Sequence, residues 1–291
     1  MIIVKLMGGL GNQMFQYAAG KALSIHLGTE LLIDRSFLDA EFENTTKRNF
    51  ELDIFAISEK IIDNNYITRN FRFDHSRRSK LISLITGKKL IHEYIENQFN
   101  FNERFFELLD KTLLIGYFQS EKYFASSSKL IKNIYSFPDI KNSNINEYSE
   151  KIKSCEAVSI HIRRGDYVKN STIANFHGTC SPEYYENAVE EIINRVKNPV
   201  AFIFSDDMDW VKNNFTSKIP YHYINLQGHA DFTDMYLMSL CKHHIIANSS
   251  FSWWGAWLGS NPAKTVIAPL KWFNDTSKNT SDLIPASWLR I

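Results

Sequence analysis

Short apolar runs alternate with longer amphipathic stretches along most of the chain. A β-branched run at 2–6 is followed by glycines and by a stretch from 12 to about 27 with apolar side chains at helical spacing. A second apolar run follows at 30–33. Strand, tight turn, helix and strand in this order predict a βαβ unit at the start of the fold.

The same alternation continues along the chain, except at 35–100, where no clear periodicity is present. Further strands are expected at 112–118, 157–162, 200–204, 221–225, 243–247 and 264–268. Further helices are expected at about 120–133, 182–197, 207–214, 231–241 and 251–259. Strands that alternate with helices predict a parallel sheet with helices on both of its faces.

A polar segment rich in Asn and Ser, at 138–150, is typical of a domain linker. We therefore expect an α/β fold with two Rossmann-like domains, 1–140 and 150–291, that face a cleft. Ligands of open α/β sheets bind beyond the carboxyl ends of the strands. Polar clusters at 161–167, 205–207 and 248–252 each follow an expected strand, so we expect them to meet at one edge.

Composition narrows the classes of partner. The chain is 44% hydrophobic and 22% charged, which is typical of a globular protein, and its formal net charge of +1 does not favour nucleic acid as a partner. The aromatic content of 14% fits either rings that stack on sugars or an aromatic-rich core. Cys155, Cys180 and Cys241 have no zinc-site spacing, and reduced thiols are expected.

The sequence also indicates where in the cell the protein is expected. Its first residues have no signal-peptide pattern, and no apolar run approaches the ~20 residues that span a bilayer, so we expect a cytoplasmic protein. The segment 68–92 holds seven Lys or Arg residues and one Asp. This segment is either a solvated basic face or a contact with an anionic lipid surface, which would place the protein peripherally at the inner membrane.

The first polar cluster contains His161, Arg163, Arg164, Gly165 and Asp166. Strand alternation would place His161 and Arg163 on one side of the strand's end. A guanidinium group binds phosphate through two hydrogen bonds and stays charged at any relevant pH, so two adjacent arginines favour a phosphate site. The alternative is a structural Arg–Asp pair at the end of a strand.

The second cluster runs from Asn248 through Ser249, Ser250 and Phe251 to Ser252 and precedes an expected helix. Asn and Ser are good N-cap residues, and a helix N-terminus attracts anions through its N–H groups and dipole. These residues either contribute to a phosphate site or only cap the helix.

The third cluster contains Asp206 and Asp207, and Asp207 with Asp209 forms a DxD pattern. Such carboxylates could hold a divalent metal, accept hydrogen bonds from a base or ribose, or cap the next helix. The metal hypothesis is the weaker one, because Arg163 and Arg164 already supply positive charge for a diphosphate.

The glycine-rich turn at 8–13 must be compared with a dinucleotide-binding motif. Gly9 and Gly11 form GxG, and Asp34 lies at the end of the next strand. However, Met14 stands where that motif requires a third small residue, so a nicotinamide cofactor is not favoured.

Taken together and in this order, GGLGNQMFQYA at 8–18, HIRRGDY at 161–167 and NSSFSWWGAWLG at 248–259 resemble the α-1,2-fucosyltransferases of glycosyltransferase family 11. The resemblance implies a GT-B-type fold and inverting transfer of fucose from GDP-fucose to the 2-hydroxyl of a galactose-terminated oligosaccharide. It also implies that the protein needs no metal or other cofactor.

The resemblance further implies roles for single residues. It implies that Arg163 and Arg164 bind the diphosphate and that His161 and Asp207 contact the guanosine. It places Ser249, Ser250, Phe251 and Ser252 around the phosphates and directs Gly9, Gly11, Asn12 and Gln13 towards the acceptor and the cleft. Asp206 and Asn248 complete the expected donor site. Three possibilities for the general base stay open: Asp166, His177, or no strong base.

Three rival hypotheses remain at this stage. The first is a transferase that uses another GDP-sugar or forms another linkage. The second is a non-catalytic glycan-binding protein, which would have no need of an arginine pair beside a helix start. The third is a nicotinamide-dependent oxidoreductase.

Overall fold

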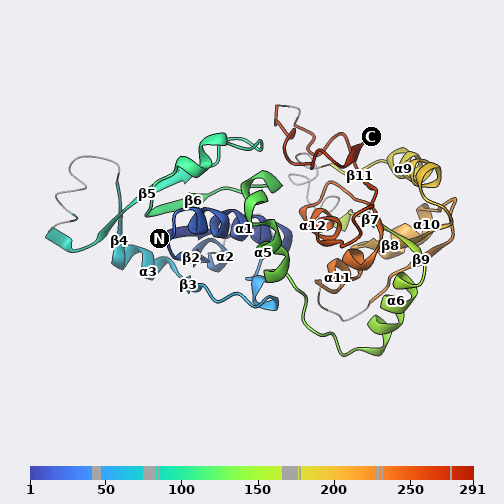
Figure 1. Ribbon diagram of the computed structural model, residues 1–291, viewed down its shortest axis with the longest axis horizontal. Coiled ribbons are helices and arrows are strands. Elements are labelled where there is room, and N and C mark those ends of the chain that lie inside the picture. Colours follow the sequence, from blue (N-terminus) through green and yellow to red (C-terminus); the bar gives the residue numbers. More distant parts are fainter. Residues whose placement is uncertain are drawn as a thin grey trace. The chain divides into compact units, whose positions relative to one another are not determined.

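The computed structural model describes residues 1–40, 47–74, 83, 85–165, 176, 178–226, 230, 232–275 and 277–291. These residues form two compact units (Figure 1). The first unit comprises Met1–Ser136 and Asn279–Leu283, and the second comprises Phe137–Lys278 and Ile284–Ile291. The chain therefore enters the second unit after Ser136, returns briefly to the first near its end, and finishes in the second.

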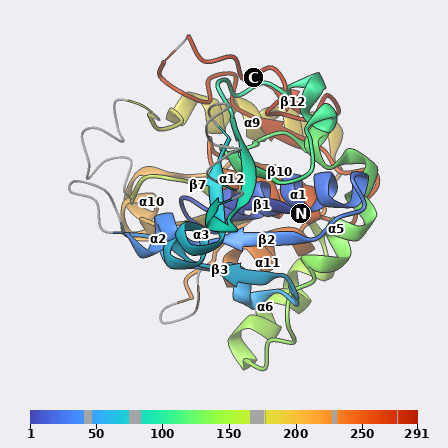
Figure 2. The same ribbon diagram turned by 90° about the vertical axis from the view of Figure 1, so that its left-hand side faces the viewer.

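A parallel sheet is the framework of the first unit. Its six described strands follow the order β3-β2-β1-β6-β5-β4, and each recorded pairing is parallel. The neighbours β1, β2 and β3 are labelled in Figure 2. Their bounds are β1 Ile2–Lys5, β2 Leu31–Asp34, β3 Lys60–Ile62, β4 Phe71–Phe73, β5 Lys89–Ile95 and β6 Thr112–Ile115. The strands expected at 2–6, 30–33 and 112–118 are therefore present, although the third is shorter than expected.

The helices of the first unit are mostly short. Their bounds are α1 Leu10–His26, α2 Ser36–Asp39, α3 Asn64–Asn70, α5 Ser128–Ile134, and the 3-10 turns η1 Leu52–Ile54, η2 Glu103–Glu107, η3 Glu121–Tyr123 and η4 Ala125–Ser127. The expected helix at 120–133 was wrong in its first half, which forms η3 and η4. Ser120 contributes to the break, since its hydroxyl accepts a hydrogen bond from the Lys122 N–H at 3.3 Å and so caps the short turn η3.

The returning segment 279–283 is attached to the first unit by Asp282. The carboxylate of Asp282 accepts a hydrogen bond from the Phe101 N–H at 3.0 Å. It also pairs with the Lys122 ammonium at 2.5 Å. A stretch near the end of the sequence thus completes the packing of a unit that is built mainly from its beginning.

A second parallel sheet organises the second unit. Its six described strands follow the order β12-β11-β10-β7-β8-β9, again with parallel pairings throughout. Their bounds are β7 Glu156–Ile162, β8 Pro199–Ser205, β9 Tyr221–Tyr223, β10 His243–Ile245, β11 Val266–Ala268 and β12 Leu289–Arg290. The five strands expected here are present, and the last three of them are shorter than expected.

Helices cover both faces of this second sheet (Figure 1). Their bounds are α6 Ser143–Lys153, α9 Pro182–Arg195, α10 Met208–Asn214, α11 Phe232–Leu240 and α12 Ser250–Leu258. Alternate residues of β7 divide between the faces: Val158 and Ile160 pack with α9 and α10, whereas Ala157 packs with α6 and α11. Most of the expected linker at 138–150 is instead part of α6, within the second unit.

The tryptophans of α12 belong to the core. Trp253 and Trp254 are fully buried, and Trp257 and Trp288 pack against Trp253. Gly255 allows the close approach of α11, because a Cβ there would lie 2.9 Å from the Met238 Cβ. For this part of the chain, the aromatic content serves the core and not a sugar platform.

None of the helices within the described ranges is long and apolar enough to span a membrane. Part of the basic segment 68–92, including Arg77, Arg78 and Lys80, lies outside the described residues. The contact of this segment with a lipid surface therefore stays a prediction.

Candidate active site

The polar clusters of the second unit meet at the carboxyl edge of its sheet. The parallel register places Ile162 of β7 beside Ser205 of β8, and Ile160 of β7 beside Ile245 of β10. The segments that begin at Arg163, Asp206 and Ile246 therefore leave three neighbouring strands on the same side. Adjacent strands lie about 4.8 Å apart, so the side chains of these segments are within reach of one another.

Arg163 and Asp206 form the centre of this edge. The Arg163 Nη1 lies 3.0 Å from the Asp206 Oδ2, and the two side chains are 23% and 24% exposed. The other oxygen of Asp206 accepts a hydrogen bond from the Arg164 N–H at 2.9 Å. Gly165 leaves room for this carboxylate, since a Cβ there would lie only 2.3 Å from the Asp206 Oδ2.

Arg164 and Asp207 are held by the start of α10. The Arg164 guanidinium lies over the Trp210 ring, 3.6 Å from the centroid, and its Nε lies 3.8 Å from the Asp207 Oδ2. Asp207 also caps α10 by accepting a hydrogen bond from the Trp210 N–H at 3.3 Å. Of the three interpretations of the acidic pair, the helix cap is therefore present for Asp207. The described residues contain no group of three or more His, Cys, Asp or Glu arranged to hold a metal.

The segment from Asn248 to Ser252 forms the start of α12. Ser249 is the N-cap, and its hydroxyl accepts a hydrogen bond from the Phe251 N–H at 3.3 Å. The amide of Asn248 donates to the Gly178 and Trp272 carbonyls at 3.2 and 3.1 Å. Asn248 therefore fixes two neighbouring loops, whereas Ser249 and Ser250 lie at a helix N-terminus suited to an anion.

His161 lies inside β7 and is only 4% exposed. Burial lowers the pKa of its imidazole to about 4, against the opposing effect of Asp206, so the ring is neutral at pH 7. Within the part of the chain that the structure describes, its buried Nδ1 has no hydrogen-bond partner, and the ring centroid lies 6.0 Å from that of Phe251 in α12. A neutral imidazole with an unused nitrogen suits hydrogen bonding to an uncharged group.

Two candidates for the general base, Asp166 and His177, lie outside the described residues. The positions that flank His177 are fixed. The Phe176 carbonyl accepts a hydrogen bond from the Asn274 N–H at 2.8 Å, and the Gly178 carbonyl is held by Asn248. The roles of Asp166 and His177 stay predictions.

The glycine-rich turn of the first unit lies at the carboxyl end of β1. Gln13 is fully buried, and its amide bonds the Gly8 and Asn49 carbonyls and the Glu51 N–H at 2.8–3.0 Å. Asn12 accepts a hydrogen bond from the Gln119 amide at 2.8 Å. The Gln13 side chain therefore links the segment at 49–51 to the start of α1. Because these bonds use its amide, a direct contact of this side chain with an acceptor is not favoured.

Asp34 does not behave as a ribose-binding carboxylate. It is fully buried, it accepts a hydrogen bond from the Ser36 N–H at 2.9 Å, and it lies 3.7 Å from the Lys5 ammonium. These internal contacts give no support to the nicotinamide hypothesis.

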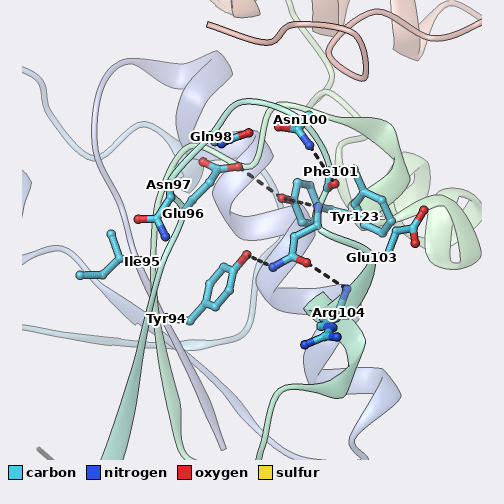
Figure 3. Close-up of a pocket in the computed structure, with 11 residues that line it drawn as sticks. Tyr94, Ile95, Glu96, Asn97, Gln98, Asn100, Phe101, Glu103, Arg104 and Tyr123 are labelled. Carbon is cyan, nitrogen blue, oxygen red and sulfur yellow. Dashed lines mark hydrogen bonds between the residues drawn. The ribbon is translucent and has the colours of Figure 1, made fainter.

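A polar pocket lies beside the carboxyl end of β5, wholly within the first unit (Figure 3). Its volume is about 450 Å³, and its lining includes Tyr94, Glu96, Asn100, Phe101 and Tyr123. Burial raises the pKa of Glu96 to about 7, although hydrogen bonds from Phe118, Tyr117 and Tyr123 act in the opposite direction. A titratable carboxyl group at a sheet edge is a candidate for acid–base work.

Comparisons with known proteins identify the family. A model of glycosyl transferase family 11 matches residues 1–291, and an alpha-1,2-colitosyltransferase of Escherichia coli is 35% identical over 297 residues, covering 100% of this chain and 98% of that protein. The chain belongs to glycosyl transferase family 11. The O-antigen biosynthesis glycosyltransferase WbnK of Escherichia coli is 34% identical to this family 11 protein, with 98% and 99% of the two chains covered.

The fold of this family 11 glycosyltransferase has a solved counterpart. The fucosyltransferase NodZ from Bradyrhizobium matches it with a TM-score of 0.51 over 87% of the chain and 90% of NodZ, at 16% identity. The GT-B-type α/β fold is confirmed, and membership of family 11 is confirmed as well.

For the site, the structure brings together Arg163, Arg164, Asp206 and Asp207 and places the start of α12 at the same edge. Their functional roles remain predictions. Sequence reasoning missed Glu96. No motif surrounds it, and the only available signal was a lone acidic residue directly after the run at 89–95.

Proposed function

We propose that this family 11 glycosyltransferase transfers L-fucose from GDP-β-L-fucose to the 2-hydroxyl of a terminal galactose in an oligosaccharide, with inversion at C1 and without a metal. The main support is the pair Arg163 and Arg164, half-buried at the carboxyl edge of the second sheet beside the start of α12. Two guanidinium groups and a helix N-terminus are suited to the charge of a leaving diphosphate.

The geometry also shows that both arginines are held in place by neighbouring residues. Asp206 contacts Arg163 through one oxygen and the Arg164 backbone through the other, so it orients both residues. Stacking on Trp210 fixes the plane of the Arg164 guanidinium. Groups fixed before the substrate arrives need not be reorganised as charge develops on the departing GDP.

The names of two relatives support attachment at a 2-position; one relative matches the whole chain and the other matches part of it. The 35% identical relative is named an alpha-1,2-colitosyltransferase. A galactoside 2-alpha-L-fucosyltransferase of Caenorhabditis elegans is 25% identical over 60% of this chain and 51% of its own length. Both names state attachment at a 2-position, and the second states fucose and a galactoside.

The test is a transfer assay with GDP-fucose and lactose in the presence of EDTA, read by GDP release and by NMR of the product. We expect an α-linked 2-O-fucosyl product at an undiminished rate. Activity lost in EDTA and restored by manganese would contradict the metal-free mechanism. Absence of both GDP release and a thermal shift with GDP would contradict the donor assignment, because a ligand of the folded state must stabilise it.

Colitose is the second candidate for the transferred sugar, because the 35% identical relative spans the whole chain and is named for it. Competition between GDP-fucose and GDP-colitose in one reaction gives the ratio of their kcat/KM values. A ratio above about tenfold in favour of colitose, or 1.4 kcal/mol, would replace fucose in the proposal and leave the arginine site unchanged.

A further inference from the structure

The polar pocket of the first unit is built around Glu96. The Oε2 of Glu96 accepts hydrogen bonds from two successive backbone N–H groups, those of Tyr117 at 2.7 Å and Phe118 at 2.9 Å. The Oε1 has a longer contact, 3.4 Å, with the Tyr123 hydroxyl. One oxygen is therefore firmly held, while the other lies on the side of the pocket where Tyr123 is drawn (Figure 3).

The backbone after β6 is shaped to hold this carboxyl group. Phe118 has a φ of 51°, in the left-handed region that non-glycine residues rarely occupy, and its side chain is fully buried. At Gly116, a Cβ would lie 2.4 Å from the Cβ of Glu96 and 2.8 Å from its Oε2. A strained residue and a close-approach glycine on either side of Tyr117 bring both N–H groups to one carboxylate oxygen, which is typical of a functional position.

The surroundings make this carboxyl group a weaker acid than an ordinary glutamate. Two N–H donors would normally favour the carboxylate, yet burial outweighs them and raises its pKa to about 7. The titratable and charged groups around the pocket are Tyr94 on β5, Tyr117 after β6, Tyr123 on η3, and Glu103 and Arg104 on η2.

The remaining lining suits a sugar. Side-chain amides of Asn97, Gln98 and Asn100 border the pocket, together with the aromatic rings of Phe101 and Tyr123. The side-chain Oδ1 of Asn100 is buried and has no hydrogen-bond partner among the described residues. Amides and carboxylates bind hydroxyl groups and rings cover apolar faces, while about 450 Å³ lies within the usual range for small-molecule pockets.

We propose that this pocket binds the acceptor sugar and that Glu96 takes the proton from its attacking hydroxyl group. The inference rests on the proposed function, because it supplies the general base for that reaction. As the acceptor oxygen forms its bond to C1 of the donor sugar, the bond from C1 to the phosphate oxygen breaks and its electron pair leaves with GDP. The hydroxyl proton passes to the Glu96 carboxylate, which later releases it to solvent.

Glu96→Gln tests the proton transfer with little change of shape, and Glu93→Gln, at an exposed position of the preceding strand β5, is the control. We expect Glu96→Gln to lower kcat by about 10²–10⁴-fold. The donor KM and the thermal shift with GDP should stay the same. The rise of wild-type activity through about pH 7 should disappear in Glu96→Gln and persist in Glu93→Gln.

Gln98→Trp tests the binding pocket separately, since Gln98 is exposed and lines it. An indole there should raise the acceptor KM at least tenfold and leave the thermal shift with GDP unchanged. An unchanged acceptor KM would overturn the pocket assignment, even if Glu96→Gln failed to fold.

The outcomes separate this inference from the proposed function. A wild-type enzyme that turns over GDP-fucose, with a Glu96→Gln kcat within about threefold of it, would overturn the role of Glu96 alone. A Glu96→Gln variant that loses acceptor affinity but keeps kcat would also overturn the proton transfer. A wild-type enzyme without GDP-fucose turnover would overturn the proposed function and this inference together.

Discussion

The two units share a six-stranded parallel sheet, but the carboxyl edges of these sheets hold charge in different ways. In the second unit, Arg163 lies 3.0 Å from Asp206 and Arg164 lies 3.8 Å from Asp207, so each charge has a charged neighbour. In the first unit, the carboxyl group of Glu96 is held by backbone N–H groups, without a cationic partner among its recorded contacts.

This difference suits two different tasks. A guanidinium beside a carboxylate keeps its charge across the physiological range, which is what binding a diphosphate requires. A buried carboxyl group stabilised only by dipoles changes its charge near neutral pH, which is what moving a proton requires. A similar sheet therefore offers a fixed charge on one unit and an exchangeable proton on the other.

Besides the loss of activity expected for Glu96→Gln, the largest effect concerns Arg163, which carries the fixed charge of the second unit. Arg163→Ala should lower kcat by about 10²–10³-fold or more, because it removes a charged donor from the leaving group. Arg163→Lys keeps the charge but loses the planar fork, so it should retain part of the activity. Steady-state kinetics and the thermal shift with GDP measure both variants. Normal turnover in Arg163→Ala, with an intact fold, would remove the basis for the arginine site.

A matched pair of glycine substitutions, one at the carboxyl edge of each sheet, should differ in their effects on GDP binding and on the stability of the fold. In Gly165→Ala the new Cβ meets the Asp206 Oδ2 at 2.3 Å, whereas in Gly116→Ala it meets the Glu96 Cβ at 2.4 Å. We expect the first to weaken GDP binding about tenfold, because the displaced Asp206 carboxylate orients Arg163 and Arg164. Its stability should change little, since only the end of a short side chain moves. The second should destabilise its unit by about 1–3 kcal/mol, because the backbone must shift.

Urea unfolding and titration with GDP measure this pair. Gly116→Ala should leave GDP affinity unchanged, and Gly165→Ala should leave the unfolding midpoint nearly unchanged. Equal losses of stability in the two variants would contradict the expected difference between displacing the end of the Asp206 side chain and shifting the backbone beside Glu96.

The two units should respond to pH in opposite directions. Because the pKa of Glu96 is raised from 4.5 to about 7, the folded first unit keeps a proton that the unfolded chain releases, and its stability falls as pH rises through this window. Because the pKa of His161 is lowered from 6.5 to about 4, the unfolded second unit binds the extra proton, and its stability falls as pH drops from 6.5 towards 4.

Hydrogen exchange of peptides from each unit, compared at pH 5 and pH 7.5, measures how the stability of each unit changes with pH. Glu96→Gln should abolish this change in β5 and β6 and leave it unaltered in β7 and β8. Changes in the same direction in both units, after correction for intrinsic exchange, would contradict the roles given to Glu96 and His161.

The smallest expected effect concerns the returning segment. Lys122→Ala removes an ion pair whose lysine is 55% exposed, so the first unit should lose less than about 1 kcal/mol. Asp282→Ala should cost more, since it also leaves the Phe101 N–H without this acceptor. Urea unfolding of both variants ranks the two losses, and the reverse order would contradict the described role of Asp282.

The sequence predicted the second unit well because its strands and motifs are local. β7 and β8 are buried runs of seven residues each, and the arginines, aspartates and helix cap follow directly after strands. Parallel pairing then implies that they meet, so their proximity could be inferred before the structure.

The first unit was harder to predict for physical reasons. β3 and β4 are three-residue strands at the two ends of the sheet order, and exposed or half-buried positions within them leave no apolar run. The pocket carboxyl group depends on a turn about 20 residues further along the chain, which brings the Tyr117 and Phe118 N–H groups to Glu96. A single glutamate carries no such information in sequence.

The return of the chain at 279–283 has a consequence for engineering. The N–H of Phe101, in the wall of the Glu96 pocket, donates a hydrogen bond to Asp282, which lies 181 residues further along the chain. A chimera that takes only residues 1–136 from a relative would pair one parent's pocket with the other parent's closing segment. Under the proposed role of the pocket in acceptor binding, a graft that exchanges acceptor preference between relatives takes two pieces, with the short stretch at 279–283 moved together with the first unit.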